Sequence, residues 1–178
     1  MAGKIQLSKP LVTSAEESII NKVIKSHFWA SGSGVGYVKK FENSLNKFTG
    51  SNTCIGVNSG TAALNLALSL FNLKNKEVLI PSLTFVSTAH AVILNGAKPI
   101  FVDVNPETLC IDEKQIQNSI TKNTKAIIPV HFAGFPCNLT AIRSICKKNN
   151  LCLIEDAAHA IGSTFNNKKI GAYGDAVC

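Results

Sequence analysis

The chain has 178 residues, of which 46% are hydrophobic and 16% are charged, and its formal net charge is +7. This composition excludes a disordered chain and allows one globular domain with a real core. No apolar run approaches the roughly 18 residues of a membrane span, and the first residues lack the pattern of a secretory signal. We therefore expect a cytoplasmic protein with no membrane partner.

The positive charge does not indicate a nucleic-acid partner. The 18 basic residues are scattered as singles and pairs, and only Arg143 is an arginine. Specific base recognition uses arginine and aromatic platforms, and the few aromatic residues form no stacking motif. The six cysteines form no Cys-x-x-Cys pair and no cluster with histidine, so we predict no metal site and mostly buried, reduced thiols.

The first 50 residues form an N-terminal arm in this interpretation. A helix is expected at 14–26, a glycine-rich GSGVG follows at 32–36, and a second helix is expected at 38–48. The GSGVG run does not indicate a dinucleotide site, because no strand precedes it.

From residue 51 onward, strands and helices are expected to alternate. Strand-like apolar runs occur at 54–57, 77–80, 99–104, 125–130, 151–155 and 175–178, and helical spacing occurs at 60–72, 83–95, 112–120 and 138–149. Nearly continuous apolar strands are typical of a sheet that is covered on both faces. The pattern predicts an α/β fold with a mostly parallel sheet. Because the last run stops without a turn or cap, we expect the chain to be a fragment.

The segment NSGTAALNLAL, residues 58–68, predicts a turn that opens a helix. Free backbone N–H groups and the helix dipole converge at Gly60, Thr61 and Ala62, where a phosphate would be held. An ordinary N-cap at Ser59, opening a core helix, explains the segment equally well. The segment is not a Walker loop, because it lacks the Gly-Lys-Ser/Thr ending.

The segment LIEDAAHAIG, residues 153–162, places the Asp156 carboxylate directly after a buried strand, at the carboxyl edge of the sheet. A carboxylate there can pair with a protonated pyridine nitrogen. The simpler alternative, an N-cap for a helix DAAHAIG, is favoured by this segment alone. His159 would contact a cofactor or fill a pocket. One segment would hold a phosphate and the other a nitrogen cation. Pyridoxal 5'-phosphate has both groups and is therefore the candidate ligand.

Phe85 follows the EVLI strand and is therefore expected at the same carboxyl edge. An aromatic ring there can stack on a planar cofactor, although a core position is the more common fate of a lone Phe. His131 and His90 are interpreted as structural.

Taken in order, five segments resemble the DegT/StrS family of sugar aminotransferases, which are fold-type-I pyridoxal phosphate enzymes. They are FENSLNKFTG, NSGTAALNLAL, PSLTFVSTAHAVILNGAKPIFVDV, TKAIIPVHFAGFPCNL and LIEDAAHAIGSTFNNKKIGAYGDAV. The resemblance implies a three-layer αβα fold with a mixed sheet. It also implies that residues 51–178 form an incomplete cofactor-binding large domain, truncated before the last strand and without the C-terminal small domain.

The resemblance also implies roles for individual residues. Thr61 and Ala62 would contact the cofactor phosphate beside Gly60, Phe85 would stack on the pyridine ring, Asp156 would bind its nitrogen, and His159 would lie beside the ring. The reaction implied is transfer of an amino group, usually from glutamate, to a nucleotide-linked keto sugar, in a homodimer.

The Schiff-base lysine of such enzymes is expected beyond Cys178, because Lys168 and Lys169 fall in the family's hairpin before the last strand. We therefore expect the 178 residues alone to be inactive and prone to self-association through open strand edges. Two alternatives stay open. One is a sugar dehydratase of the same family, in which another residue replaces the lysine, and the other is a non-catalytic truncated pseudoenzyme.

Overall fold

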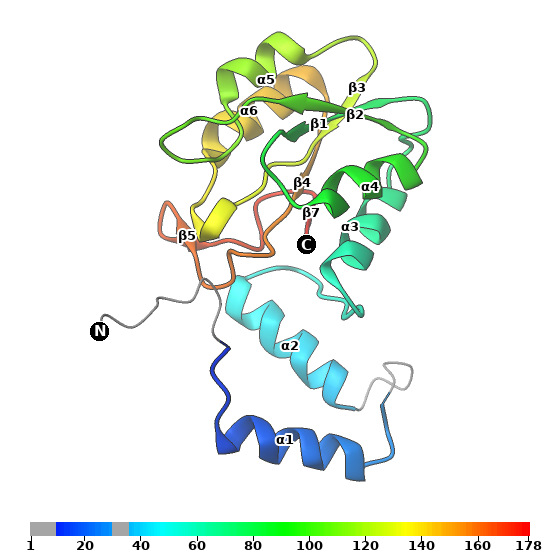
Figure 1. Cartoon of the computed structure of the whole chain (residues 1–178), viewed down its shortest axis with the longest axis vertical. Helices are drawn as coiled ribbons and strands as arrows, with labels where there is room; N and C mark the ends of the chain where they lie inside the picture. Colours follow the sequence, from blue (N-terminus) through cyan, green and yellow to red (C-terminus); the bar gives the residue numbers. More distant parts are fainter. Residues whose placement is uncertain (1–9, 30–35) are drawn as a thin grey trace, which may run out of the picture.

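The computed structural model describes residues 10–29 and 36–178, so Gly32 to Val35 of the GSGVG run lie outside it. The chain runs from two N-terminal helices into an α/β core (Figure 1). The elements are α1 (Ser14–Lys25), α2 (Tyr37–Thr49), α3 (Gly60–Ser69), β1 (Glu77–Pro81), α4 (Val86–Leu94), β2 (Lys98–Val102), α5 (Glu113–Ser119), β3 (Thr124–Ile127), the 3-10 helix η1 (Phe132–Gly134), α6 (Leu139–Asn149), β4 (Cys152–Glu155), β5 (Thr164–Phe165), β6 (Lys168–Lys169) and β7 (Ala176–Val177).

The core contains a five-stranded sheet in the order β2-β1-β3-β4-β7, and every neighbouring pair is parallel. Each strand except β7 reaches its parallel neighbour through a crossover that contains a helix, because parallel strands cannot be joined by a tight turn. The predicted α/β fold is confirmed, and five of the six expected strands are present with ends that differ by a few residues.

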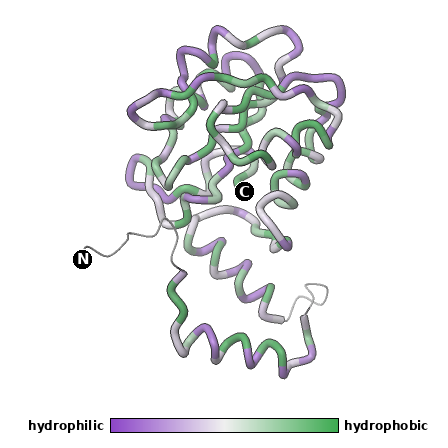
Figure 2. The backbone as a smooth tube through the Cα atoms, in the orientation of Figure 1, coloured by the Kyte–Doolittle hydropathy of each residue, from purple (hydrophilic) through white to green (hydrophobic). Residues whose placement is uncertain are grey.

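Helices cover the sheet on both faces, which gives three layers. Val78 and Ile80 of β1 point into a cluster with α3 and α4, whereas Leu79 between them points into a cluster with α5 and α6. All three side chains are fully buried, as alternation along a strand requires when both faces are covered. Figure 2 shows hydrophobic residues concentrated along the inner elements and polar residues in the outer loops.

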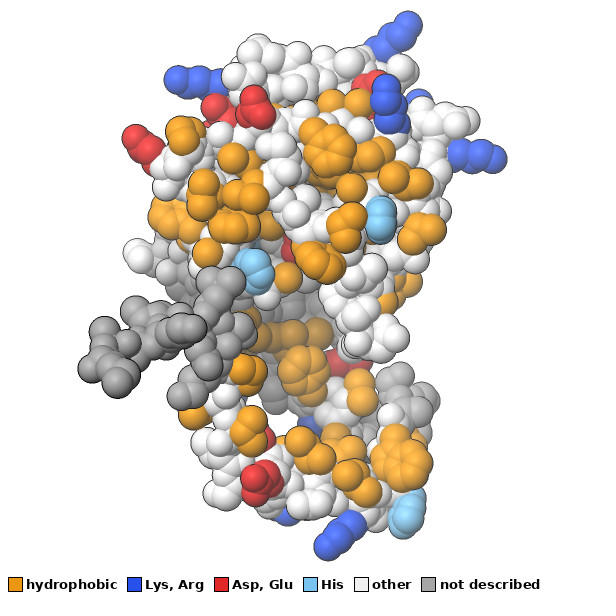
Figure 3. Space-filling view, in the orientation of Figure 1, with side chains coloured by type: hydrophobic (Ala, Val, Ile, Leu, Met, Phe, Trp, Pro, Cys, Tyr) orange, Lys and Arg blue, Asp and Glu red, His pale blue; other side chains and the backbone are white. Residues whose placement is uncertain are grey.

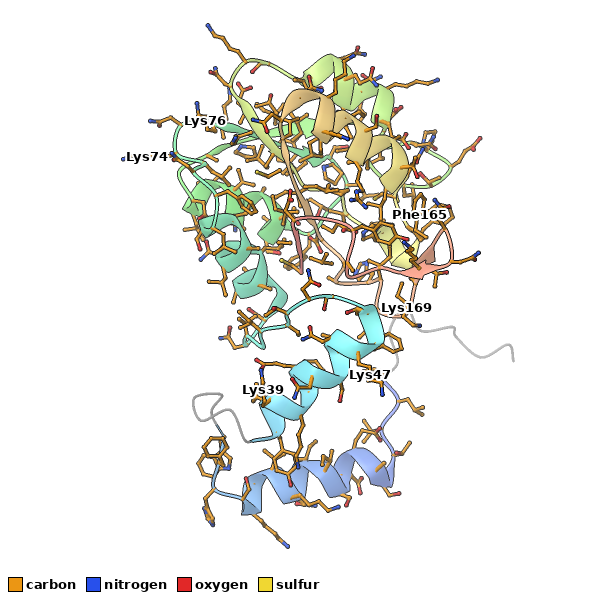
Figure 4. The ribbon with its side chains drawn as sticks, turned by 180° about the vertical axis from the view of Figure 1, so that it is seen from behind. Lys39, Lys47, Lys74, Lys76, Phe165 and Lys169 are labelled. Carbon is orange, nitrogen blue, oxygen red and sulfur yellow. The ribbon has the colours of Figure 1, made fainter. Side chains whose placement is uncertain are left out.

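A short antiparallel hairpin, β5 with β6, precedes the last strand and contains Lys168 and Lys169. The expected position of these two lysines in a hairpin is therefore confirmed. The hairpin contacts the end of α2, where the Lys169 ammonium lies 4.0 Å from the centre of the Phe48 ring (Figure 4).

The segment 54–57 is not a strand, and this prediction is wrong. Ile55 is 67% exposed, and the Gly56 N–H donates to the Glu42 carboxylate at 2.8 Å instead of to a sheet neighbour. An apolar run becomes a strand only when another strand pairs with it, and none of the described strands pairs with this one. Within the described ranges, no helix is both long and apolar enough to cross a membrane.

Candidate functional site

The start of α3 offers free backbone donors. Ser59 is the N-cap, and its hydroxyl accepts from the Ala62 N–H at 3.2 Å. The ordinary N-cap is therefore present, yet it uses only one of the donors of the first turn. Within the described residues, the N–H groups of Gly60 and Thr61 have no partner. A Cβ built on Gly60 would meet nothing within 4 Å, so the space in front of these donors is open.

Phe85 lies between β1 and α4, directly before the first residue of that helix. Its side chain is 74% exposed, so the interpretation of Phe85 as a core residue is wrong. A large exposed aromatic ring at the carboxyl end of a parallel strand is available to stack on a flat ligand.

Asp156 extends β4 by one residue and bridges in parallel to Val130, and it is only 6% exposed. Its two carboxylate oxygens accept from different elements. The Thr88 hydroxyl of α4 donates to Oδ2 at 2.9 Å, and the Ala158 N–H donates to Oδ1 at 3.3 Å. These bonds fix the plane of a buried carboxylate, which needs such partners to remain charged.

The N-cap interpretation of Asp156 is wrong, because the expected helix DAAHAIG does not form. Residues 157–162 are turns, in which Ala160 N–H bonds to the Ala157 carbonyl and Gly162 has a φ of +88°. The Asp156 side chain bonds two residues ahead, which favours a turn over a helix. The carboxylate is therefore held at the sheet edge without capping a helix.

His159 lies in these turns with an exposed side chain. Its Nδ1 accepts from the Ala133 N–H at 3.3 Å, and its ring meets Phe132 edge to face with the centroids 6.1 Å apart. These contacts orient the imidazole and leave Nε2 without a partner among the described residues.

Thr88 is a functional candidate that the sequence analysis missed. It is fully buried in the first turns of α4, and its hydroxyl also lies 2.7 Å from that of Thr84. Because the single proton of Thr88 goes to Asp156, Thr84 must be the donor of that second bond. The only sequence signal is the spacing of four residues between the two threonines. Their partner Asp156 is remote in the sequence.

His131 is fully buried beside the site and makes a structural network, in agreement with its interpretation as structural. Its Nδ1 accepts from the Cys137 N–H at 3.0 Å, so Nε2 carries the proton and donates to Glu155 at 2.9 Å. Glu155 is also fully buried, and its second oxygen accepts from the Gly174 N–H. The network therefore ties the end of β4 to the loops around it.

The cysteines are all free thiols, and no group of three or more metal-ligating side chains occurs in the described part of the chain. Cys110 and Cys137 are buried neighbours. A hydrogen bond from the Cys137 thiol lowers the pKa of Cys110 to about 7, and burial raises the pKa of Cys146 to about 12.

The predicted site residues gather on one side of the core. The starts of α3 and α4 and the end of β4 lie on the side of the core that faces the arm, toward its lower end in Figure 1. The bond between Thr88 and Asp156 joins the start of α4 to the end of β4, and α3 packs against α4. The donors, the aromatic ring and the carboxylate therefore belong to neighbouring elements.

In α/β proteins with a parallel sheet, ligands bind at the carboxyl ends of the strands, which is where these groups lie. The chain belongs to the DegT/DnrJ/EryC1/StrS aminotransferase family, which it matches over residues 11–178.

Known relatives agree with this assignment. The uncharacterized protein MJ1066 of Methanocaldococcus jannaschii is 46% identical over 137 residues, which are 76% of this chain and 36% of that protein. The solved PLP form of Spr1654 from Streptococcus pneumoniae, a proposed sugar aminotransferase, superposes with a TM-score of 0.89 at 28% identity. The match covers 96% of this chain and 47% of Spr1654.

A third relative is DesI, solved in the presence of its TDP-sugar product, with a TM-score of 0.84 at 30% identity. The match covers 94% of this chain and 42% of DesI. The chain thus spans less than half the length of each of these proteins. The fold is that of sugar aminotransferases that use pyridoxal phosphate.

Proposed function

We propose that the protein containing this chain is a pyridoxal phosphate-dependent aminotransferase that transfers an amino group, usually from glutamate, to a nucleotide-linked keto sugar. The observation that carries the proposal is the buried Asp156 carboxylate, held by Thr88 on one oxygen and by a backbone N–H on the other. These two bonds leave further lone pairs of the carboxylate available, at the carboxyl edge of the sheet where a pyridine nitrogen would be received.

The residues present fit this cofactor. The open N–H groups of Gly60 and Thr61, with Ala62 behind them, match an anionic phosphate at a helix start. Phe85 would stack on the ring, Asp156 would hold the ring nitrogen, and His159 would lie beside the ring. When bound, pyridoxal phosphate supplies an electron sink for the carbon that gains or loses the amino group.

Asp156 has a defined electrostatic task in this proposal. Its negative charge favours a protonated pyridine nitrogen, since opposite charges at contact distance stabilise each other's charged forms. Thr88 is a positioning residue, because it fixes Oδ2 and leaves the remaining lone pairs of the carboxylate to the ring.

The sugar substrate, the amino donor and a homodimeric assembly are proposed from family membership and from relatives such as DesI with its TDP-sugar product. We also expect residues 1–178 by themselves to be inactive. The chain spans less than half of its relatives, and Lys168 and Lys169 both lie in or beside the β5–β6 hairpin.

Asp156→Asn in the whole natural protein tests the central step. The amide keeps the shape but loses the charge, so the half-reaction with glutamate should slow by about a hundredfold or more, a loss typical of a missing electrostatic contact. The cofactor absorbance spectrum and stopped-flow rates measure this. Asp103→Asn, at an exposed carboxylate near the same edge of the sheet, is the control and should change little. An unchanged rate for Asp156→Asn would remove Asp156 from the mechanism.

Phe85→Ala tests stacking separately. The ring is exposed, so its loss leaves no core cavity, and cofactor retention should weaken by about 1–3 kcal/mol. Equilibrium dialysis of the cofactor measures the effect. Equal retention in Phe85→Ala and the wild type would show that the ring does not stack.

A further inference from the structure

A second hollow lies at the amino edge of the sheet, opposite the proposed cofactor site. It has a volume of about 470 Å³ and is lined only by polar and basic residues, namely Asn72, Lys76, Lys122, Thr124, Lys125, Asn149 and Asn150. Asn72 and Lys76 precede β1, and Lys122 precedes β3. Thr124 and Lys125 begin β3, and Asn149 and Asn150 lie at the end of α6, so three separate parts of the fold line the hollow. Figure 4 shows Lys74 and Lys76 together at this end of the core.

The excess positive charge of the chain is concentrated around this hollow. Seven of the 18 basic residues lie at this edge, either before or at the amino ends of the strands or in the last turn of α6, and they are Lys74, Lys76, Lys98, Lys122, Lys125, Lys147 and Lys148. Among the described residues, Glu77 and Asp175 are the acidic ones at this edge, at the amino ends of β1 and β7, so the edge carries about five of the seven net positive charges of the chain. Figure 3 shows basic side chains projecting from the upper part of the core. In the described ranges, none of the seven has a carboxylate within 4.0 Å.

The negative carboxyl ends of the helices at this edge do not balance the positive charge of the lysines. The helices α3, α4, α5 and α6 all end at this edge, and each carboxyl end carries the equivalent of about half a negative charge. Four helix ends therefore provide about two negative charges in total. Five net positive charges exceed that amount, and their mutual repulsion favours binding of an anion.

We propose that this hollow binds a small anion that carries two or more phosphate groups. Lysine ammonium groups bind phosphate as point charges, and the asparagine amides supply further donors. The buried Thr124 hydroxyl accepts from the Thr121 N–H, and its own proton has no acceptor within the part of the chain that the structure describes. The volume suits a small molecule, since ligand pockets measure about 300–1,000 Å³.

The proposal is independent of the proposed enzymatic function, because the hollow and Asp156 lie at opposite edges of the sheet. A nucleic acid suits the hollow less well. The residues that line it include neither arginine nor an aromatic side chain, the groups that bind bases.

Calorimetric titration of the whole natural protein with pyrophosphate tests the proposal, at low and at physiological ionic strength. The double variant Lys122→Gln, Lys125→Gln should weaken binding by about tenfold or more. The double variant Lys114→Gln, Lys168→Gln is the matched control, because it also removes two positive charges, from the first turn of α5 and from the β5–β6 hairpin, both away from the hollow. It should change the affinity by less than about twofold. Circular dichroism and the melting temperature confirm that each variant is folded.

Three results would overturn the proposal. The first is no binding of pyrophosphate by the wild-type protein. The second is equal weakening by the control variant Lys114→Gln, Lys168→Gln and by Lys122→Gln, Lys125→Gln, which would show attraction by diffuse charge alone. The third is binding of polyglutamate but not of pyrophosphate, which would assign this surface to an acidic protein partner.

Discussion

The α/β core and the N-terminal arm use apolar side chains in opposite ways. In the core, the strands β1, β3 and β4 bury nearly every side chain between two helical layers. In the arm, α1 has a normal capping box and amphipathic spacing, yet none of its residues is buried. Helix signals therefore predict local structure in both regions, whereas burial depends on a partner that only the core contains. Four pairs of substitutions test how far this difference extends.

The largest effect is expected in the buried network of the core. Glu155→Ala removes the acceptor of both His131 Nε2 and the Gly174 N–H. Breaking a buried pair at one partner costs about 3–5 kcal/mol, because the other partner loses its compensation. Urea unfolding of the purified protein measures this loss. Glu17→Ala in α1 is the control, and its exposed side chain should contribute less than about 0.5 kcal/mol.

A pair of isoleucines compares the two regions directly. Ile154 in β4 is fully buried, and its replacement by alanine should cost about 2–5 kcal/mol through lost contacts and a cavity. Ile20 in α1 is 57% exposed, so Ile20→Ala should cost less than about 1 kcal/mol. Urea midpoints of the two variants measure the difference. Equal losses would show that the apolar face of α1 is buried in the natural protein, and the contrast would then be withdrawn.

Gly171 tests the contact between the core and the arm. Gly171 has a φ of +133°, and a Cβ there would lie 2.6 Å from the Thr49 side chain at the end of α2. Gly50→Ala is the control, because Gly50 also has a positive φ of +75° but open space around it. Gly171→Ala should therefore be less stable than Gly50→Ala by about 1–3 kcal/mol from overpacking. Hydrogen exchange across α2 should rise in Gly171→Ala. Equal stability of the two variants would mean that α2 moves away at no cost.

The sequence predicted the core well, because continuous apolar runs indicate strands wherever parallel neighbours cover them. The prediction of a strand at 54–57 failed because Ile55 and Val57 have apolar side chains, but no strand of the described part of the chain pairs with them. The sequence also predicted a helix after Asp156. An alanine-rich pattern does not reveal that the Asp156 carboxylate bonds to the Ala158 N–H and starts a turn.

The residues of the candidate site also differ in whether local sequence patterns reveal them. Gly60, Phe85 and Asp156 could be found because each begins, precedes or follows an element whose position the sequence predicts. Thr88 could not be found, because its importance comes from a hydrogen bond to a residue 68 positions away. Likewise, only the fold shows that lysines from separate connections share one hollow.

The smallest expected effect lies in the arm and decides whether α1 unfolds independently. Thr13 accepts from the Ala15 N–H at 3.2 Å, and Glu16 bonds back to the Thr13 N–H. Thr13→Ala should lower the stability of this helix by about 1 kcal/mol. Because α1 buries nothing, we expect faster hydrogen exchange at 14–25 with an unchanged urea midpoint for the whole protein. Ser18→Ala, within the same helix, should not accelerate exchange, because alanine is the better helix former. A lower midpoint for Thr13→Ala would instead show that α1 unfolds together with the core, and the two regions would then be one cooperative unit.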